Sequence, residues 1–198
     1  ICMVLDTQGK LLIAPPNMPD PRFRKSVMYI WKHDVSGAAG VIINKKCQQP
    51  DFKHICKEGN ILSAPNINHP VYYGGPIMTN VVGVLHSTDF TLKSTSRVGM
   101  LNDAGFTMDR KILEVIAQGG GPKNKVITLG LANWSTGQLE EELEHPRNPA
   151  MSWLIMDYNE KFVFEQLTKE KPDVIWENFV SQAIQNKTQE ITAKVFKD

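Results

Sequence analysis

Short apolar runs separated by turn-forming residues organise the first half of the chain. Residues 11–13 form one such run, and residues 26–31 and 40–44 are rich enough in β-branched and aromatic side chains to predict strands. Residues 33–37 have the composition of a turn, so these two strands predict a β-hairpin. Residues 14–21 contain four prolines, which cannot continue a helix or a central strand and therefore predict a stiff, shaped loop.

The middle of the chain alternates polar segments with short strands. Residues 45–70 are polar and mixed, without a strong period, and predict a loop or a short helix. Strands are expected at residues 71–73, which end on the Gly-Gly-Pro breaker at residues 74–76, and at residues 81–86. Residues 87–104 are polar again and predict a long surface connection.

A helical period enters in the second half. Ile112, Val115 and Ile116 recur at i, i+3 and i+4, which predicts an amphipathic helix over residues 108–118. The apolar run at residues 125–131 then predicts a return strand.

The last third of the chain mixes further helices and strands. Ser135 or Thr136 offers an N-cap for a helix through residues 138–143. Two short strands are expected at residues 153–156 and 162–164. A helix is expected at residues 173–184, and the residues from 186 onward are polar enough to fray.

The order of these elements indicates the fold class. Strands lead and helices are interspersed without regular βαβ alternation, which favours an α+β fold with a mainly antiparallel or mixed β-sheet and flanking helices. A length of 198 residues without a linker or low-complexity segment predicts a single compact domain over residues 1–198, with a polar C-terminal tail at about residues 186–198.

Composition excludes several classes of protein. Hydrophobic residues make up 41% and charged residues 22%, so the chain is not disordered. The formal net charge of +1 gives no electrostatic reason for binding nucleic acid or a membrane surface. The longest apolar runs are far too short to span a bilayer. Three scattered cysteines predict reduced thiols, and we expect a cytoplasmic protein without a membrane association.

Searches for catalytic and cofactor motifs give no complete match. The glycines at residues 119–121 follow a predicted helix instead of opening one, and no phosphate-loop pattern surrounds them. Residues 133–137 lack the first glycine of G-x-S-x-G, so Ser135 is better explained as a helix cap. The five histidines show no metal-ligand spacing, and we expect neither a metal nor a cofactor.

His86 and Glu140 are the candidate catalytic residues. His86 ends an apolar strand and precedes Ser87, a position that suits a general acid or base but is more typical of a histidine that anchors a loop. Glu140 and Glu142 are two residues apart, so on a helix they do not share a face and do not form a carboxylate pair. Acidic residues in the first turn of a helix also favour the helix dipole.

Several motifs, taken in order, match a known bacterial family. They occupy residues 11–15, 18, 20–23, 26–27, 37–44, 71–76, 85–87, 130, 132, 134 and 137–143. By these motifs the chain resembles the AlgH/YqgE family over about residues 9–182. Two positions depart from the family's Gly-Tyr-Ala-Gly-Trp: Leu131 lacks the tyrosine hydroxyl, and Asn133 replaces a glycine.

The resemblance implies a compact α/β sheet protein of unassigned biochemical activity. The family carries a label of transcriptional regulator, linked to alginate control in one lineage. The sequence contains no DNA-reading element, so direct nucleic-acid binding is not expected.

The motif glycines and polar residues leave two interpretations open. They either satisfy backbone geometry, or they form a shared polar pocket. The second interpretation gives a candidate binding set of Asn44, Gly74, Gly75, His86, Ser87, Gln138 and Glu140. Asn44 and Asp20 are also candidate hydrogen-bonding groups at loop mouths, or turn residues.

Three functional hypotheses follow. The first is a cytoplasmic regulatory or binding protein that acts through an unknown protein partner or small-molecule ligand. The alternative is an enzyme or small-molecule binder in which His86 is the acid or base and Glu140 its charge partner. The third is a direct DNA-binding regulator.

Overall fold

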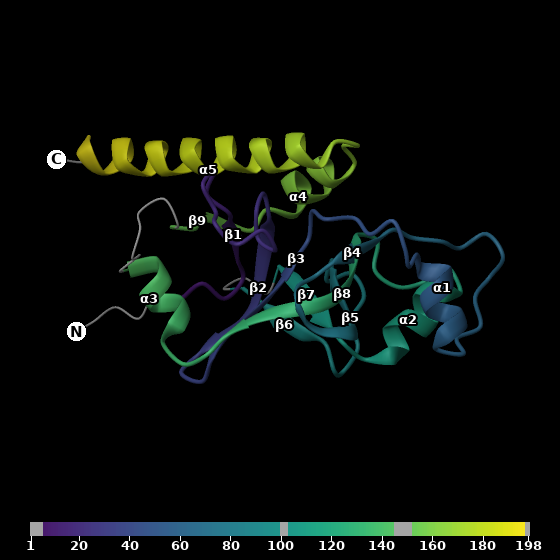
Figure 1. Ribbon diagram of the computed structural model, residues 1–198. Helices are drawn as coiled ribbons and strands as arrows, with labels where there is room; N and C mark the ends of the chain where they lie inside the picture. The colour runs from purple at the N-terminus through teal and green to yellow at the C-terminus, as the bar shows by residue number, and fades with distance from the viewer. Residues whose placement is uncertain (1–5, 100–102, 145–151, 197–198) are drawn as a thin grey trace.

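The computed structural model describes residues 6–99, 103–144 and 152–196 (Figure 1). Its described strands are β1 (Lys10–Ile13), β2 (Val27–Asp34), β3 (Gly37–Ile42), β4 (Val71–Tyr73), β5 (Ile77–His86), β6 (Ser96–Val98), β7 (Ala104–Thr107), β8 (Lys125–Trp134) and β9 (Leu154–Asp157). Its described helices are α1 (Phe52–Glu58), α2 (Arg110–Ala117), α3 (Gln138–Glu144), α4 (Glu160–Leu167) and α5 (Pro172–Val195).

One curled sheet joins the strands in the order β6-β7-β5-β8-β3-β2-β1-β9, with β4 beside β8. Neighbours along this order are antiparallel, and β4 is parallel to β8. The predicted hairpin is formed by β2 and β3. The expected α+β class, a single compact domain with a mainly antiparallel or mixed sheet and flanking helices, is confirmed.

The start of β2 shows why its apolar run is continuous instead of alternating. Val27 and Tyr29 face a core that includes Phe179 of α5. Met28 and Ile30 face the opposite core, which is shared with α3. Because the strand is buried on both faces, every position at its start needs an apolar side chain.

Helix α5 lies along one side of the molecule and packs against β1 and β9 (Figure 1). Pro172 occupies its first turn, where proline is tolerated. The indole N–H of Trp176 donates to the carbonyl oxygen of Ala14 at 3.0 Å. The helix therefore anchors the residue at which the proline-rich loop begins. Within the described part of the chain, no helix has both the length and the apolarity needed to cross a membrane.

The strand predicted at residues 162–164 is wrong, because this segment lies in α4. The side chain of Asn159 caps the helix by accepting the backbone N–H of Phe162 at 2.9 Å. The ring of Phe162 meets that of Phe179 edge-on, with centroids 5.1 Å apart. Packing against α5 and the cap therefore override the aromatic composition that favoured a strand.

The expected fraying from residue 186 is also wrong, because α5 continues to Val195. Its last turns are exposed and mostly polar, and half of residues 186–195 are good helix formers, namely lysine, glutamine, glutamate and alanine. Lys194 and Glu190 add an ion pair at 2.8 Å one turn apart. The connection expected at residues 87–104 contains β6, which pairs with β7. Non-local pairing makes a strand from a segment that is polar in sequence.

The sheet depends on a close approach of two backbones at Gly74, Gly75 and Gly130. A Cβ added to Gly74 would lie 2.2 Å from the carbonyl oxygen of Gly130. A Cβ added to Gly75, whose φ is 155°, would lie 2.2 Å from the carbonyl carbon of Leu131. The carbonyl oxygen of Gly74 accepts the N–H of Ile42 at 2.8 Å. Of the two interpretations left open above, the geometry of Gly74 and Gly75 supports the one based on backbone geometry.

We expect Gly74→Ala to destabilise the protein by about 3 kcal/mol or more, because backbone atoms cannot move aside as flexible side chains do. Gly137→Ala is the comparison variant: unlike Gly74, Gly137 has a positive φ of 73°, so its alanine is strained in the backbone, but an added Cβ there meets nothing within 4 Å. That variant costs about 1–2 kcal/mol from the left-handed backbone alone. Urea unfolding followed by tryptophan fluorescence measures both. Equal losses in the two variants would show that the close approach is not needed.

Candidate functional site

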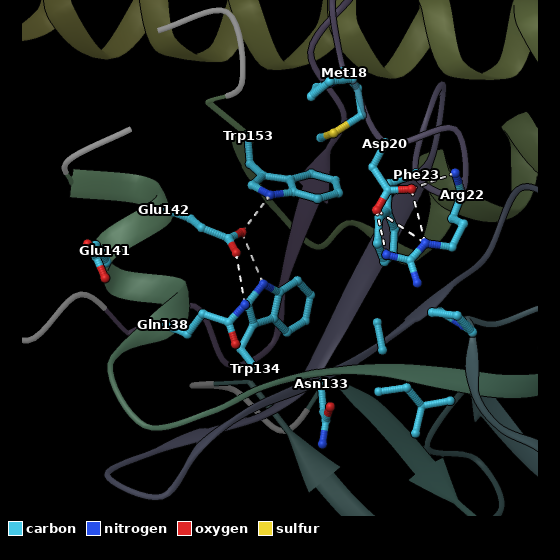
Figure 2. Close-up of a pocket in the computed structure, with 14 residues that line it drawn as sticks. Met18, Asp20, Arg22, Phe23, Asn133, Trp134, Gln138, Glu141, Glu142 and Trp153 are labelled. Atoms are coloured by element: carbon cyan, nitrogen blue, oxygen red, sulfur yellow. Dashed lines mark hydrogen bonds and ion pairs between the residues drawn. The ribbon is translucent and has the colours of Figure 1, made fainter. Parts of the chain in front are cut away.

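A pocket of about 520 Å³ lies between the proline-rich loop, the ends of two strands and α3 (Figure 2). Its size is in the range of small-molecule sites. The described residues that line it are Met18, Pro19, Asp20, Arg22, Phe23, Pro76, Ile77, Ala132, Asn133, Trp134, Gln138, Glu141, Glu142 and Trp153. Aromatic, acidic and amide side chains therefore share one cavity.

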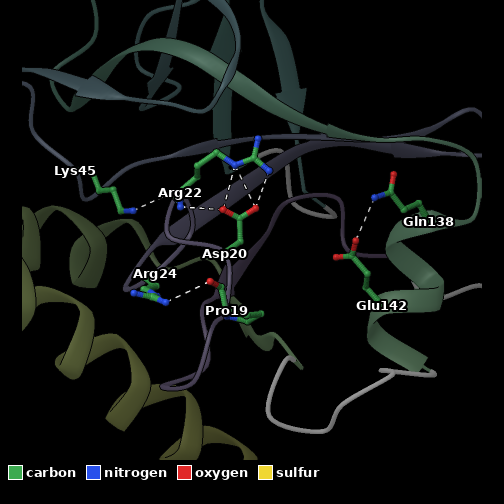
Figure 3. Close-up of polar contacts among 7 residues, drawn as sticks. All are labelled: Pro19, Asp20, Arg22, Arg24, Lys45, Gln138 and Glu142. Atoms are coloured by element: carbon green, nitrogen blue, oxygen red, sulfur yellow. Dashed lines mark hydrogen bonds and ion pairs between the residues drawn. The ribbon is translucent and has the colours of Figure 1, made fainter.

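The proline-rich loop presents an ion pair at one side of this pocket (Figure 3). Arg22 donates from Nε to Asp20 Oδ1 at 3.0 Å and from Nη2 to Asp20 Oδ2 at 2.7 Å. The hydrogen bond from Arg22 holds the pKa of Asp20 below its usual value. Arg24 donates to the carbonyl oxygens of Met18 and Pro19 at 3.1 and 3.3 Å. These bonds fix a loop whose prolines already restrict its backbone.

Lys45 stabilises the same loop by a hydrogen bond to its backbone. Its Nζ donates to the carbonyl oxygen of Arg22 at 2.9 Å, and burial lowers its pKa. The guanidinium of Arg22 also lies over the ring of Phe23, with Cζ 5.6 Å from the ring centroid. The cation of Arg22 is therefore already engaged by a carboxylate and by an aromatic face.

Helix α3 supplies the opposite side of the pocket through Glu142. Its Oε2 accepts the indole N–H of Trp134 at 3.1 Å and, at a longer 3.4 Å, that of Trp153. Its Oε1 accepts the amide N–H of Gln138 at 3.2 Å. Figure 2 shows the two indole rings one above the other, with Glu142 reaching between them from α3. One carboxylate thus sets the orientation of two aromatic rings.

Gln138 is the one residue of the candidate binding set that lines this pocket. Its amide oxygen accepts the N–H of Ser135 at 3.0 Å and the hydroxyl of Ser135 at 3.2 Å. This return contact from the first turn of α3 resembles half of a capping box. Ser135 therefore contacts the first residue of α3, but its hydroxyl donates to Gln138 instead of accepting a backbone N–H of the helix as the predicted N-cap would.

Glu140 faces away from the pocket and pairs with His33, not with His86. Its Oε1 accepts from Nε2 of His33 at 3.0 Å, while Nδ1 of His33 accepts the N–H of Thr7 at 3.1 Å. Burial alone would raise the pKa of Glu140, but hydrogen bonds from its own backbone N–H and from His33 hold it below the usual value. The proposed charge partnership between His86 and Glu140 is therefore wrong. A residue two positions from Glu142 on a helix cannot share its face.

His86 lies fully buried at the end of β5. Its Nε2 is 2.8 Å from Oγ1 of Thr107, and its Nδ1 is 2.9 Å from the carbonyl oxygen of Ser87. An added Cβ on Gly105 would lie 2.6 Å from the ring, so β7 covers the imidazole closely. Of the two interpretations left open for His86, the geometry supports the loop anchor. The hydroxyl of Ser87 likewise serves local structure by donating to Asp89.

Asn44 connects the proline-rich loop to the sheet. Its Oδ1 accepts the N–H of Val27 at 2.8 Å, and its Nδ2 donates to the carbonyl oxygen of Lys25 at 2.8 Å. Asn44 is buried and does not line the pocket. It supports the site indirectly by fixing the end of the loop that carries Asp20 and Arg22.

The sequence reasoning missed the aromatic residues of the site. Phe23 and Trp134 belong to motifs that matched the family, but their rings were assigned no role. Trp153 was considered only as part of a strand, although its ring lies edge-on to Phe23 at 6.1 Å. The sequence marks Phe23 by its place among charged residues beside the proline-rich loop, whereas no such pattern surrounds Trp134 or Trp153. Within the described residues, no group of three or more His, Cys, Asp or Glu side chains could hold a metal ion.

Comparison with known sequences finds a matching family model and similar bacterial proteins. A family model described as AlgH-like matches residues 11–187. The chain is similar to a UPF0301 protein of Rhodopseudomonas palustris, with 37% identity over 173 residues covering 83% of this chain and 77% of that protein. A UPF0301 protein of Jannaschia sp. is 37% identical over 171 residues, covering 85% of each chain.

Two solved structures share the fold. The solution structure of the AlgH protein from Pseudomonas aeruginosa aligns with a TM-score of 0.69 and 27% identity, covering 93% of both chains. An X-ray structure of a Corynebacterium diphtheriae protein aligns with a TM-score of 0.57, covering 89% of this chain and 94% of that one. Its 17% identity shows the fold alone.

Stability should fall at acidic pH because of His86. Burial lowers the pKa of His86 from its usual 6.5, so below about pH 6.5 the unfolded chain takes up a proton that the folded protein does not. This difference lowers the unfolding free energy by up to about 1.4 kcal/mol per pH unit as the pH decreases. His86→Gln removes that contribution, so we expect its destabilisation to be largest at pH 8 and to shrink toward pH 5.

Urea titrations at several pH values measure this effect. His54→Gln is the control, because the side chain of His54 is 51% exposed on α1. A constant gap between the wild type and His86→Gln from pH 8 to pH 5 would contradict the buried, neutral imidazole.

Proposed function

The chain belongs to the AlgH-like family, and within it we propose that this protein is a non-catalytic binding protein whose ligand occupies the pocket between the proline-rich loop and α3. The observation that carries the proposal is the arrangement around Glu142, which holds the indole rings of Trp134 and Trp153. Aromatic walls that are oriented in advance reduce the ordering cost of binding.

The lining chemistry supports binding better than catalysis. Acyl or group transfer needs a nucleophile within hydrogen-bond reach of a base. The described lining contains no histidine, cysteine, serine, threonine or lysine. Asp20, the acidic residue on the loop side, is held as a carboxylate by Arg22 and has a lowered pKa, which makes it a poor general acid or base near pH 7.

The enzyme alternative centred on His86 and Glu140 loses its geometric support. His86 is covered by β7, and Glu140 pairs with His33. A protein that binds a ligand without converting it fits the regulatory character expected from the sequence. We therefore extend the proposal to a cytoplasmic regulator whose pocket occupancy is detected by a partner.

We expect small aromatic probes to perturb the indole N–H signals of Trp134 and Trp153 in proton–nitrogen correlation spectra. A suitable panel is benzylamine, benzyl alcohol and benzoate, each titrated into the uniformly labelled protein. The signals of Trp31 and Trp176 are internal controls, because neither residue lines the pocket. Single Trp→Phe variants assign the four signals.

A selective shift of the two pocket indoles by at least one probe supports the proposal. Phe23→Ala should weaken that binding about 5- to 10-fold, since aromatic contacts contribute about 0.5–1.5 kcal/mol beyond the area that they bury. If all three probes leave Trp134 and Trp153 unmoved, the pocket is not a binding site and the proposed function fails.

A further inference from the structure

The charges around the pocket are not balanced. Its described lining carries three carboxylates, on Asp20, Glu141 and Glu142, and one guanidinium, on Arg22. The guanidinium of Arg22 is already paired with the carboxylate of Asp20 through two hydrogen bonds. Within the described residues, no salt bridge involves Glu141 or Glu142. Among the described residues, the α3 side of the pocket therefore combines the edges of two largely buried indole rings with two carboxylates that no described cation pairs.

The hydrogen bonds of Glu142 do not remove this charge. Its three donors among the described residues, the indole N–H groups of Trp134 and Trp153 and the amide of Gln138, are neutral. They orient the carboxylate and solvate it, but its formal charge remains. On the loop side, Lys45 donates to the carbonyl oxygen of Arg22 and does not line the pocket.

Aromatic faces and carboxylates attract the same kind of ligand. The face of an indole ring carries negative electrostatic potential and binds ammonium groups, most strongly when they are partly desolvated. A nearby carboxylate adds direct Coulomb attraction. An anion would be repelled both by the negative face of the indole ring and by the carboxylate. We infer that the ligand of this pocket carries a compact cationic head, a protonated or alkylated amine, seated beside Trp134 and Trp153 and facing Glu141 and Glu142.

This inference rests on the proposed function and adds the charge class of the ligand to it. Three probes of nearly equal shape separate charge from size: choline, the neutral 3,3-dimethylbutan-1-ol and the anionic 3,3-dimethylbutanoate. Each is titrated at an ionic strength held constant with sodium chloride, and the indole signals of Trp134 and Trp153 give the dissociation constants. We expect choline to bind about 2- to 30-fold more tightly than the alcohol, and the acid to bind most weakly.

Variants that remove one carboxylate charge from α3 test whether Glu141 and Glu142 attract the cation. Glu141→Gln should weaken choline binding about threefold and leave the alcohol unchanged, as expected for the loss of one solvent-screened charge at the rim of the pocket. Glu144→Gln is the matched control on the same helix, because Glu144 does not line the pocket. Glu142→Gln should weaken choline further, while its amide oxygen can still accept an indole N–H.

Each outcome has a distinct meaning. If the alcohol or the acid binds as tightly as choline, or if only the aromatic panel binds, the cationic ligand class is wrong and the binding function stands. The cationic ligand class is also wrong if Glu141→Gln and Glu144→Gln change the dissociation constant of choline equally. If neither the choline series nor the aromatic panel shifts Trp134 and Trp153, both the inference and the proposed function fail.

Discussion

The close approach of Gly74 and Gly75 to Gly130 is the constraint on which the sheet depends. Residues 127–129 of β8 pair with β4, and residues 132–134 pair with β3, so two strands occupy successive parts of one edge of β8. The segment between β4 and β5 passes the point where β8 changes its pairing from β4 to β3. At this point its backbone lies directly against that of β8. A side chain at Gly74 or Gly75 would push β3 or β5 away from β8. The same crossing places Pro76 and Ile77 at the edge of the pocket.

Helix α3 connects two networks with different purposes because its residues face opposite ways. Glu140 turns inward to His33, which also accepts the N–H of Thr7, and so ties the helix to β2 and to the segment before β1. Glu142 turns to the pocket and holds Trp134. The His33 network therefore holds the helix through contacts separate from those of Glu142. This division explains how an exposed seven-residue helix presents its carboxylates at a defined position.

The local parts of this fold could be predicted from the sequence, and the parts that depend on distant contacts could not. Turn residues between two apolar runs were sufficient for the β2–β3 hairpin. The strand-end position of His86 was correct, but its role depends on Thr107 and Gly105 in a strand that the sequence did not reveal. Helical spacing correctly indicated that Glu140 and Glu142 face apart. It could not indicate that His33, 107 residues away, is the partner of Glu140.

Anchoring two indole rings does not by itself require a charged acceptor. The amide oxygen of Gln or Asn accepts an indole N–H with no desolvated charge, and burying part of a carboxylate costs free energy unless it is compensated. Glu142 nonetheless carries a carboxylate, and Glu141 beside it in the chain also lines the pocket. The helix dipole favours the charge of Glu141, which lies in the first turn of α3. For Glu142 the proposed cation would add a second reason, because it would pair with the carboxylate and contact the aromatic rings at once.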